Sequence, residues 1–449
     1  MISASMHFPA GFLWGTATSS YQVEGNNTTS DWSQWEQDPG RILNGHRSGK
    51  ACDWWSGRWK EDFDLAAQDG HNAHRLSIEW SRVEPSPGKW DVDALDHYRT
   101  IVSGALARGL TPLVTLHHFS NPLWLVEEGG WHASTVVEHF AAFTRKVVET
   151  LGDLVTRWVT INEPNVLLYN GYVDGVFPPG ETDLRSLPPL TVNLLRAHAS
   201  AYHTIHELVP DAQVGMAHHY RSFHPARERS SLDRYVAAMR SRLFNHLFPS
   251  AVASGVVNMI KRIPVPEVVG TQDFMGLNYY TRELSRFSLL NPEQMLKEGK
   301  FADKALLSQT GFIAHQPEGF WEALQWARGF RLPIYITENG IDDGEDRIRP
   351  IYLAEHIQQA WRAANFNWQL KGYFYWTLVD NFEWERGWTQ PFGLYALDRK
   401  TQQRTPRRSA QFFSEICRAN GLSSEMIYRY APDALDRIFP PRQPDDLAE

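Results

Sequence analysis

The sequence has few of the features that mark secreted, membrane or disulfide-stabilised proteins. Only two of its 449 residues are cysteine, Cys52 and Cys417, and they are far apart with no CxxC motif. A disulfide framework is therefore excluded, and two free thiols in a reducing compartment are expected. No signal-peptide pattern and no run of about 18 apolar residues is found. The sequence predicts a cytoplasmic protein without a membrane partner.

The sequence also lacks a cluster of basic residues and a histidine pair with the spacing of metal ligands. The chain has 44 basic and 52 acidic residues, a net charge of −8, and no basic tract. This balance argues against nucleic acid or an anionic membrane as a partner. The histidines His198, His203 and His206 are spaced five and three residues apart, so they give no ligand pair at i, i+4. No metal site is predicted.

Apolar and aromatic residues are abundant, at 42% and 13% of the chain, with 18 tryptophans. Segments with the character of strands alternate with segments of helical spacing. The predicted strands cover residues 12–17, 72–78, 112–116, 156–161, 213–217, 273–279, 333–337 and 372–378. The predicted helices cover residues 58–68, 92–108, 134–151, 192–208, 232–246, 320–327, 352–364 and 406–419, with Ser134 as an N-cap. A polar, tryptophan-rich loop is predicted over residues 21–55.

Eight strands alternating with helices predict a (β/α)8 TIM barrel, an α/β fold that is built as one domain of about 250 residues or more. The competing fold is a doubly wound open sheet, but no glycine-rich dinucleotide fingerprint follows the first strand. We therefore predict a single catalytic domain over residues 1–449 with elaborated βα loops. The C-terminal tail, residues 422–449, is of uncertain order, and the oligomeric state stays open.

Two glutamates occupy equivalent places at the ends of predicted strands. Glu163 follows the fourth strand in Thr160-Ile161-Asn162-Glu163-Pro164, and Glu338 follows the seventh in Ile336-Thr337-Glu338-Asn339-Gly340. In a barrel of parallel strands both ends lie at the catalytic face. Glycoside hydrolysis requires two carboxyl groups that face each other across one bond. The pair therefore favours a glycosidase, and Asn339-Gly340 is interpreted as a turn.

From Phe12 to about Ala410 the chain resembles the family-1 glycoside hydrolases, the β-glucosidase and β-galactosidase family. Besides the two glutamate motifs, the resemblance rests on Tyr21-Gln22-Val23-Glu24-Gly25, Arg75-Leu76-Ser77-Ile78-Glu79-Trp80, Asn278-Tyr279-Tyr280-Thr281 and Asp380-Asn381-Phe382-Glu383-Trp384. It implies a (β/α)8 barrel that hydrolyses terminal β-glycosides with retention. The expected partner is a small-molecule β-glycoside or an oligosaccharide, and no cofactor is expected.

The resemblance also implies roles for individual residues. Glu338 matches the nucleophile and Glu163 the acid/base, while Arg75 and Tyr280 match residues that support the nucleophile. Two carboxylates at the spacing of a retaining enzyme repel each other, so one pKa should rise. The positions implied to bind substrate are Gln22, His118, Asn162, Asn278, Tyr280, Trp376, Glu383 and Trp384. Two positions depart from the usual pattern. Phe119 replaces a tryptophan that flanks the sugar, which leaves the gluco, galacto and fuco preference open, and Trp388 replaces a tyrosine near the entrance, on the aglycone side.

Three other functions are compatible with the same fold. A transglycosidase would use the same residues, and the sequence does not separate it from a hydrolase. A 6-phospho-β-glycosidase would carry Ser, Lys and Tyr around the Glu383-Trp384 region, where this chain has an acid. A non-catalytic sugar-binding barrel would have lost a carboxylate, whereas both Glu163 and Glu338 are present.

Overall fold

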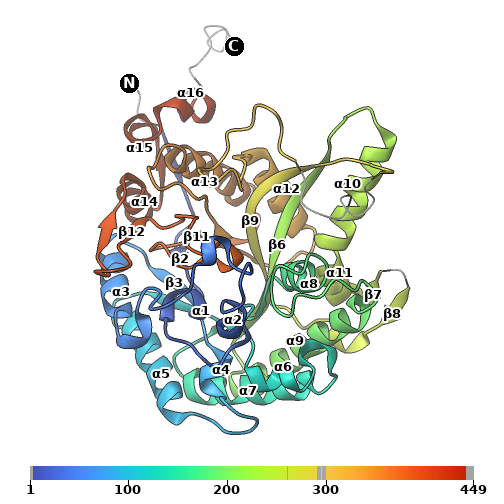
Figure 1. Ribbon diagram of the computed structural model, residues 1–449. Helices are drawn as coiled ribbons and strands as arrows, with labels where there is room; N and C mark the ends of the chain where they lie inside the picture. The colour runs from blue at the N-terminus through green and yellow to red at the C-terminus, as the bar shows by residue number, and fades with distance from the viewer. Residues whose placement is uncertain (1–3, 260, 291–294, 296–299, 441–449) are drawn as a thin grey trace.

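Eight parallel strands close into a barrel at the centre of the molecule (Figure 1). The computed structural model describes residues 4–259, 261–290, 295 and 300–440. In spatial order the barrel strands are β10 (Ile334–Asn339), β11 (Leu370–Trp376), β2 (Leu13–Ala17), β3 (Ala73–Ser77), β4 (Thr111–His117), β5 (Arg157–Asn162), β6 (Gln213–Pro225) and β9 (Phe274–Ser285). All neighbouring pairs are parallel, including the closing pair of β9 and β10. The predicted (β/α)8 fold is confirmed.

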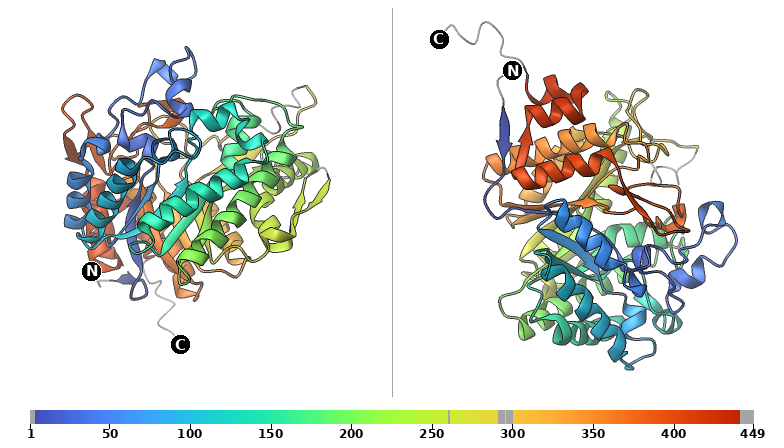
Figure 2. Two further views of the ribbon diagram at one scale, coloured as in Figure 1. Left: turned by 90° about the horizontal axis from the view of Figure 1, so that it is seen from below. Right: turned by 90° about the vertical axis from the view of Figure 1, so that its left-hand side faces the viewer.

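Helices surround the barrel on all sides, as the views of Figure 2 show. The longer ones are α3 (Trp59–Gln68), α5 (Val92–Leu106), α7 (Val136–Leu151), α9 (Leu187–Leu208), α10 (Ser231–Phe244), α12 (Pro317–Arg328), α13 (Arg349–Asn365) and α14 (Arg408–Ala419). Shorter ones are α1 (Ser20–Glu24), α2 (Asp31–Trp35), α4 (Trp80–Val83), α6 (Leu123–Glu127), α8 (Pro164–Tyr172) and α11 (Leu247–Ser254). Small hairpins pair β7 (Val256–Asn258) with β8 (Arg262–Pro264), and β12 (Tyr395–Leu397) with β13 (Arg404–Pro406).

The core has two layers because successive side chains of a barrel strand point in opposite directions. Small and branched residues such as Ala73, Leu113 and Val159 form a cluster separate from the larger one. The larger cluster lies between the strands and the helices and holds most of the tryptophans. Trp14, Trp80 and Trp158 are almost fully buried there. Most of the aromatic excess therefore serves packing.

The first and last strands of the described chain pair beside α13 and α14. Strand β1 (Ser5–His7) pairs with β14 (Gly421–Ser423) in an antiparallel ladder. Beyond it, α15 (Ser424–Tyr430) and α16 (Leu435–Ile438) bury Ile427 and Ile438. The predicted tail is thus ordered as far as the structure describes it, and residues 441–449 lie outside the described residues.

Several local predictions were wrong. The segment 21–55 contains α1 and α2 as well as loop. Helix α7 begins after Thr135, which makes no side-chain cap, so Ser134 is not its N-cap. Helix α9 begins five residues earlier than predicted, at Leu187, with proline in its first turn, where a missing N–H costs nothing. Strands β6 and β9 pair well beyond the barrel, to Pro225 and Ser285.

The described residues contain neither a membrane-spanning helix nor a metal-binding cluster of side chains. None of the helices there is long and apolar enough to cross a bilayer. Within the same residues no three His, Cys, Asp or Glu side chains cluster in a way that would hold a metal ion.

Candidate active site

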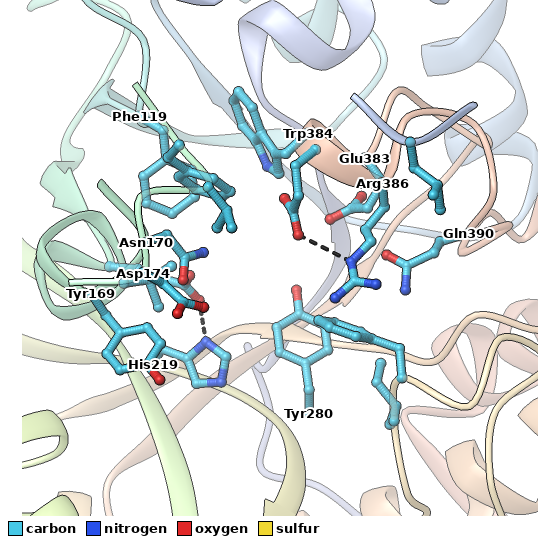
Figure 3. A pocket seen from close by; sticks show the side chains of 18 of the residues that line it. Phe119, Tyr169, Asn170, Asp174, His219, Tyr280, Glu383, Trp384, Arg386 and Gln390 are labelled. Carbon is cyan, nitrogen blue, oxygen red and sulfur yellow. Dashed lines mark hydrogen bonds and ion pairs between the residues drawn. The ribbon is translucent and has the colours of Figure 1, made fainter. Parts of the chain in front are cut away.

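A cavity of about 480 Å³ opens at the carboxyl ends of the barrel strands (Figure 3). Both strand-end glutamates, Glu163 and Glu338, line this cavity. Other predicted residues in its wall are His118, Tyr280, Trp376, Glu383 and Trp384. Segments that are distant in sequence therefore converge on one space, at the end of the barrel where this fold carries its chemistry.

Glu338 is held by two donors at the end of β10. Arg75, fully buried in the middle of β3, donates from Nη1 to Glu338 Oε1 at 2.5 Å. The Tyr280 hydroxyl donates to the other oxygen, Oε2, at 2.6 Å. Each carboxylate oxygen thus has one fixed partner, which orients the side chain and favours its ionised form.

The two residues after Glu338 do not form the predicted turn. Asn339 is the last residue of β10, and its side-chain Nδ2 donates to the backbone oxygen of Tyr279 at 2.6 Å. A Cβ on Gly340 would lie 2.0 Å from the backbone oxygen of Trp376. Asn339-Gly340 therefore serves close packing between β10 and its neighbours, and the turn interpretation is wrong.

Glu163 lies directly after β5 and caps α8. Its backbone is left-handed, with φ 43° and ψ 59°, and Pro164 begins the helix. This unusual conformation for a non-glycine residue is of the kind found at functional sites. The carboxyl oxygen Oε1 accepts from Asn278 Nδ2 at 2.8 Å and lies 3.2 Å from His219 Nδ1.

A buried chain of hydrogen bonds connects the two glutamates. Arg75, which holds Glu338 through Nη1, donates from Nη2 to Asn162 Oδ1 at 2.7 Å. The same oxygen accepts from Asn278 Nδ2 at 3.2 Å, and that amide also holds Glu163. The chain fixes the positions of the two carboxyl groups relative to each other.

The two carboxyl groups influence each other's ionisation. Burial raises the pKa of Glu338 to about 7, assisted by the negative charge of Glu163 and opposed by Arg75 and Tyr280. Burial also raises the pKa of Glu163, but His219, Asn278 and Arg75 together bring it below its ordinary value. Like charges confined to one dry site do not ionise independently, so the pair keeps one proton up to about pH 7.

The opposite side of the cavity carries a carboxyl group among aromatic rings. Gln22 Nε2 donates to Glu383 Oε2 at 3.1 Å, and burial raises the pKa of Glu383 well above its ordinary value. The His118 ring is nearly parallel to the Trp376 and Trp384 rings, and its centroid lies 6.0 Å from each. Burial lowers the pKa of His118 well below its ordinary value, so its ring is neutral. Flat rings beside hydrogen-bonding groups suit a polyhydroxylated ring.

The predicted residues fall into two groups by position. The cavity wall contains the carboxyl groups, the aromatic residues, Tyr280 and His118. Gln22, Asn162, Asn278 and Arg75 are fully buried and are not in the wall; the hydrogen bonds above link them to it. Phe119 lines the cavity, whereas Trp388, whose Nε1 donates to the Arg47 backbone oxygen at 2.9 Å, does not.

Sequence reasoning missed part of the wall. This part includes Tyr169, Asn170, Asp174 and Phe177 after β5, His219, Arg221 and Glu283 on the extensions of β6 and β9, and Arg386 after β11. The sequence feature that could have identified His219 as a wall residue is its place just beyond the end of the fifth predicted strand. Glu283 pairs there with Arg221 at 2.6 Å and with Arg240 at 2.8 Å.

Comparisons with known proteins agree with this geometry. Residues 4–422 match the family model for glycosyl hydrolase family 1. Beta-glucosidase A of Thermotoga maritima is 36% identical over 446 residues, covering 92% of this chain and 98% of the relative. A beta-glycosidase structure from Pyrococcus horikoshii is 38% identical, with a TM-score of 0.88 over 95% of this chain and 98% of that one. The Thermotoga maritima beta-glucosidase in complex with glucoimidazole has a TM-score of 0.87 at 33% identity, over 93% of this chain and 100% of that one. The chain therefore belongs to glycosyl hydrolase family 1.

Proposed function

We propose that the protein is a retaining β-glycosidase that hydrolyses terminal, non-reducing β-D-glycosides, with glucosides as the first substrates to test. The observation that carries the proposal is the pair of buried glutamates in one cavity. One is held by a cation and a phenol, and the other is held by an amide and an imidazole. Different surroundings for two carboxyl groups are what a nucleophile and an acid/base require. Relatives named beta-glucosidase support the substrate class.

In the first step the ionised Glu338 attacks the anomeric carbon, and Glu163 gives its proton to the departing glycosidic oxygen. Arg75 and Tyr280 orient the nucleophile. The ester that forms has no negative charge, so the repulsion that opposed ionisation of Glu163 is gone. Glu163 then accepts a proton from water as the water attacks, which releases the sugar with its original configuration.

The sugar is proposed to lie between the two glutamates and Glu383, with its face against Trp376. Glu383, supported by Gln22, would hold hydroxyl groups on the far side of the ring. Asn162 and His118 are bonded to each other at 3.1 Å, and Asn162 is the group proposed for the 2-hydroxyl. The residues beyond Glu163, around Tyr169 and Arg221, would face the aglycone.

The first experiment is a panel of aryl β-glycosides: glucoside, galactoside, fucoside, mannoside and 6-phosphoglucoside. Turnover of the first three, with little of the phosphorylated substrate, is expected. A preference for the 6-phosphoglucoside would overturn the assignment of the sugar site. Product analysis with and without an acceptor alcohol separates hydrolysis from transglycosylation.

The roles of the glutamates are tested separately. A 2-deoxy-2-fluoro glucoside should label Glu338, and a label on another residue would refute its role. Glu163→Ala should impair substrates with poor leaving groups most, and azide should restore its turnover. If azide has no effect, Glu163 is not the acid/base. Glu84→Gln is a matched control, since Glu84 is buried outside the cavity and bonded to Trp80 Nε1 at 2.8 Å.

We also propose that residues 1–449 form a single catalytic domain and that the protein acts in the cytoplasm. Cys52 and Cys417, the two cysteines, are both unpaired and buried, which supports a reducing compartment.

A further inference from the structure

His219 lies against Glu163, and none of the roles above includes it. It belongs to the part of β6 that extends beyond the barrel, and it is 7% exposed. Its ring lies 5.5 Å from the Tyr280 ring and 5.6 Å from the Phe244 ring, measured between centroids. Its Nδ1 faces Glu163 Oε1 at 3.2 Å. Figure 3 shows a dashed line that starts at the His219 ring. In the described part of the chain His219 Nε2 has no hydrogen-bond partner.

Both groups that hold Glu163 contact the same oxygen, Oε1. Asn278 is fixed as the donor there, because its own Oδ1 accepts from Thr337 Oγ1 at 2.6 Å and so the amide nitrogen points to Glu163. Among the described residues no hydrogen bond reaches Glu163 Oε2. That oxygen is therefore the one left for a glycosidic bond, and Oε1 is an acceptor.

The acceptor character of Oε1 decides which nitrogen of His219 carries hydrogen. If Nδ1 lacked a hydrogen, its lone pair would face the lone pairs of Oε1 at 3.2 Å, which is repulsive. A hydrogen on Nδ1 makes the contact attractive and leaves the unpartnered Nε2 as the bare nitrogen. A neutral imidazole with its hydrogen on Nδ1 satisfies every contact that the structure describes.

We propose that His219 is a positioning residue for the acid/base. Its Nδ1–H and the Asn278 amide together occupy Glu163 Oε1, which places the acidic proton on Oε2, the oxygen that faces the substrate. The inference rests on the proposed function of Glu163. In the second half of the reaction the same two donors stabilise the carboxylate that activates water.

The neutral form of His219 is the productive one. Charged and titratable groups near the pair include Tyr280, Glu338 and Arg75. The same cavity wall also carries Asp174, Arg221, Glu283 and Glu383, whereas Phe244 on α10 is apolar. The charge of an imidazolium is the largest of the influences that lower the pKa of Glu163. With it, the shared proton would move to Glu338 and block the nucleophile. Without it, Arg75 favours Glu338 as the ionised member, because Arg75 is the largest of the influences that lower the pKa of Glu338 and the smallest of those given for Glu163.

The proposal is tested by the pH dependence of kcat/KM, whose basic limb reports loss of the proton from Glu163 in the free enzyme. His219→Phe removes a donor to the carboxylate, so this limb should move to higher pH by at least about half a unit. His219→Asn keeps a nitrogen donor at the same distance from the backbone, and should move the limb less. A limb that is unchanged in His219→Phe, or moves equally in both variants, would overturn the proposal.

Two controls separate positioning from a general structural role. His224→Phe removes another histidine of β6, which pairs with Glu322 at 3.0 Å outside the cavity wall, and should leave the pH profile unchanged. In a Glu163→Ala background, His219→Phe should add no further loss of kcat/KM, because His219 acts through Glu163. A further loss as large as in the wild-type background would contradict the proposal.

A measurement without turnover keeps the proposal testable if the variants fold poorly or the proposed function fails. In the wild-type protein labelled with ¹⁵N-histidine, His219 should show a protonated Nδ1 and a bare Nε2 at neutral pH. The opposite tautomer would refute the inference. A correct tautomer in a protein that hydrolyses no β-glycoside would instead refute the proposed function alone.

Discussion

Tyr280→Phe should displace the acidic limb of the pH profile with little change elsewhere in the structure. The substitution deletes one oxygen, which donates to Glu338 Oε2 at 2.6 Å. Among the influences on Glu338, this bond lowers the pKa, while burial raises it to about 7. Because the nucleophile attacks as a carboxylate, any loss of stabilisation of the ionised form appears as lost activity at low pH.

The size of the effect follows from the kind of bond. A hydrogen bond to a charged group is worth about 1.5–3 kcal/mol. Each pKa unit corresponds to about 1.4 kcal/mol, so the pKa of Glu338 should rise by about one to two units. On the acidic side, kcat/KM should then fall about tenfold for each unit of displacement. Arg75 remains as the second donor, so the nucleophile keeps its cation.

The assay is kcat/KM for an aryl β-glucoside from about pH 4 to about pH 9 at constant ionic strength. Tyr279→Phe is the matched control, since the neighbouring hydroxyl donates to the Gln316 backbone oxygen at 2.8 Å and not to a carboxylate. It should lower stability without moving either limb. An acidic limb that coincides in wild type and Tyr280→Phe, with both proteins folded, would refute the reasoning.

Three further predictions concern binding and stability. Glu383→Leu should lower kcat/KM by about 10²-fold or more at all pH values, because the hydroxyl-binding side of the cavity loses its carboxyl group; an effect below about threefold would remove Glu383 from the sugar site. Arg404→Ala leaves Asp62, 2.7 Å away and 1% exposed, as an unpaired buried charge, and should cost about 3–5 kcal/mol in denaturant unfolding; Arg99→Ala, which breaks an exposed pair with Asp153, should cost at most about 1 kcal/mol. Cys52 and Cys417 are buried, and burial raises the pKa of both, so a thiol reagent should react only after unfolding; rapid labelling of the native protein would contradict their burial.

The sequence carried enough information for the barrel because each barrel strand is a short apolar run between turn signals, and because period and length separate strands from helices. It also placed the two glutamates at strand ends, which in a closed parallel barrel is enough to bring them to one face. The roles given to the individual site residues stay predictions, since the structure shows where they lie and not what they do.

Other parts of the site could not be predicted because their signals are ambiguous. Pro164 is compatible with the end of a strand, but here it starts α8 at a position that needs no N–H. The fifth strand is predicted to end at Ala217, but pairing with β9 beyond the barrel extends β6 to Pro225. His219 reaches the cavity through that extension. Whether a loop residue lines the cavity depends on its contacts with residues that are distant in sequence.

The hydrogen-bond chain between the glutamates limits what single substitutions can reveal. Asn162 holds Arg75 through one atom and His118 through another, while Asn278 holds both Asn162 and Glu163. Removing either asparagine therefore changes the surroundings of both carboxyl groups at once. Residues that share partners have non-additive effects, so their coupling has to be measured by double-mutant cycles. Tyr280 and His219 are better probes of the two glutamates, because the polar side-chain contact of each goes to one glutamate, Glu338 for Tyr280 and Glu163 for His219. A double-mutant cycle of Tyr280→Phe with His219→Phe, measured through the pH dependence of kcat/KM, should show whether the two carboxyl groups titrate as one unit. If they do, the coupling between the two substitutions should vanish when Glu163 is replaced by alanine.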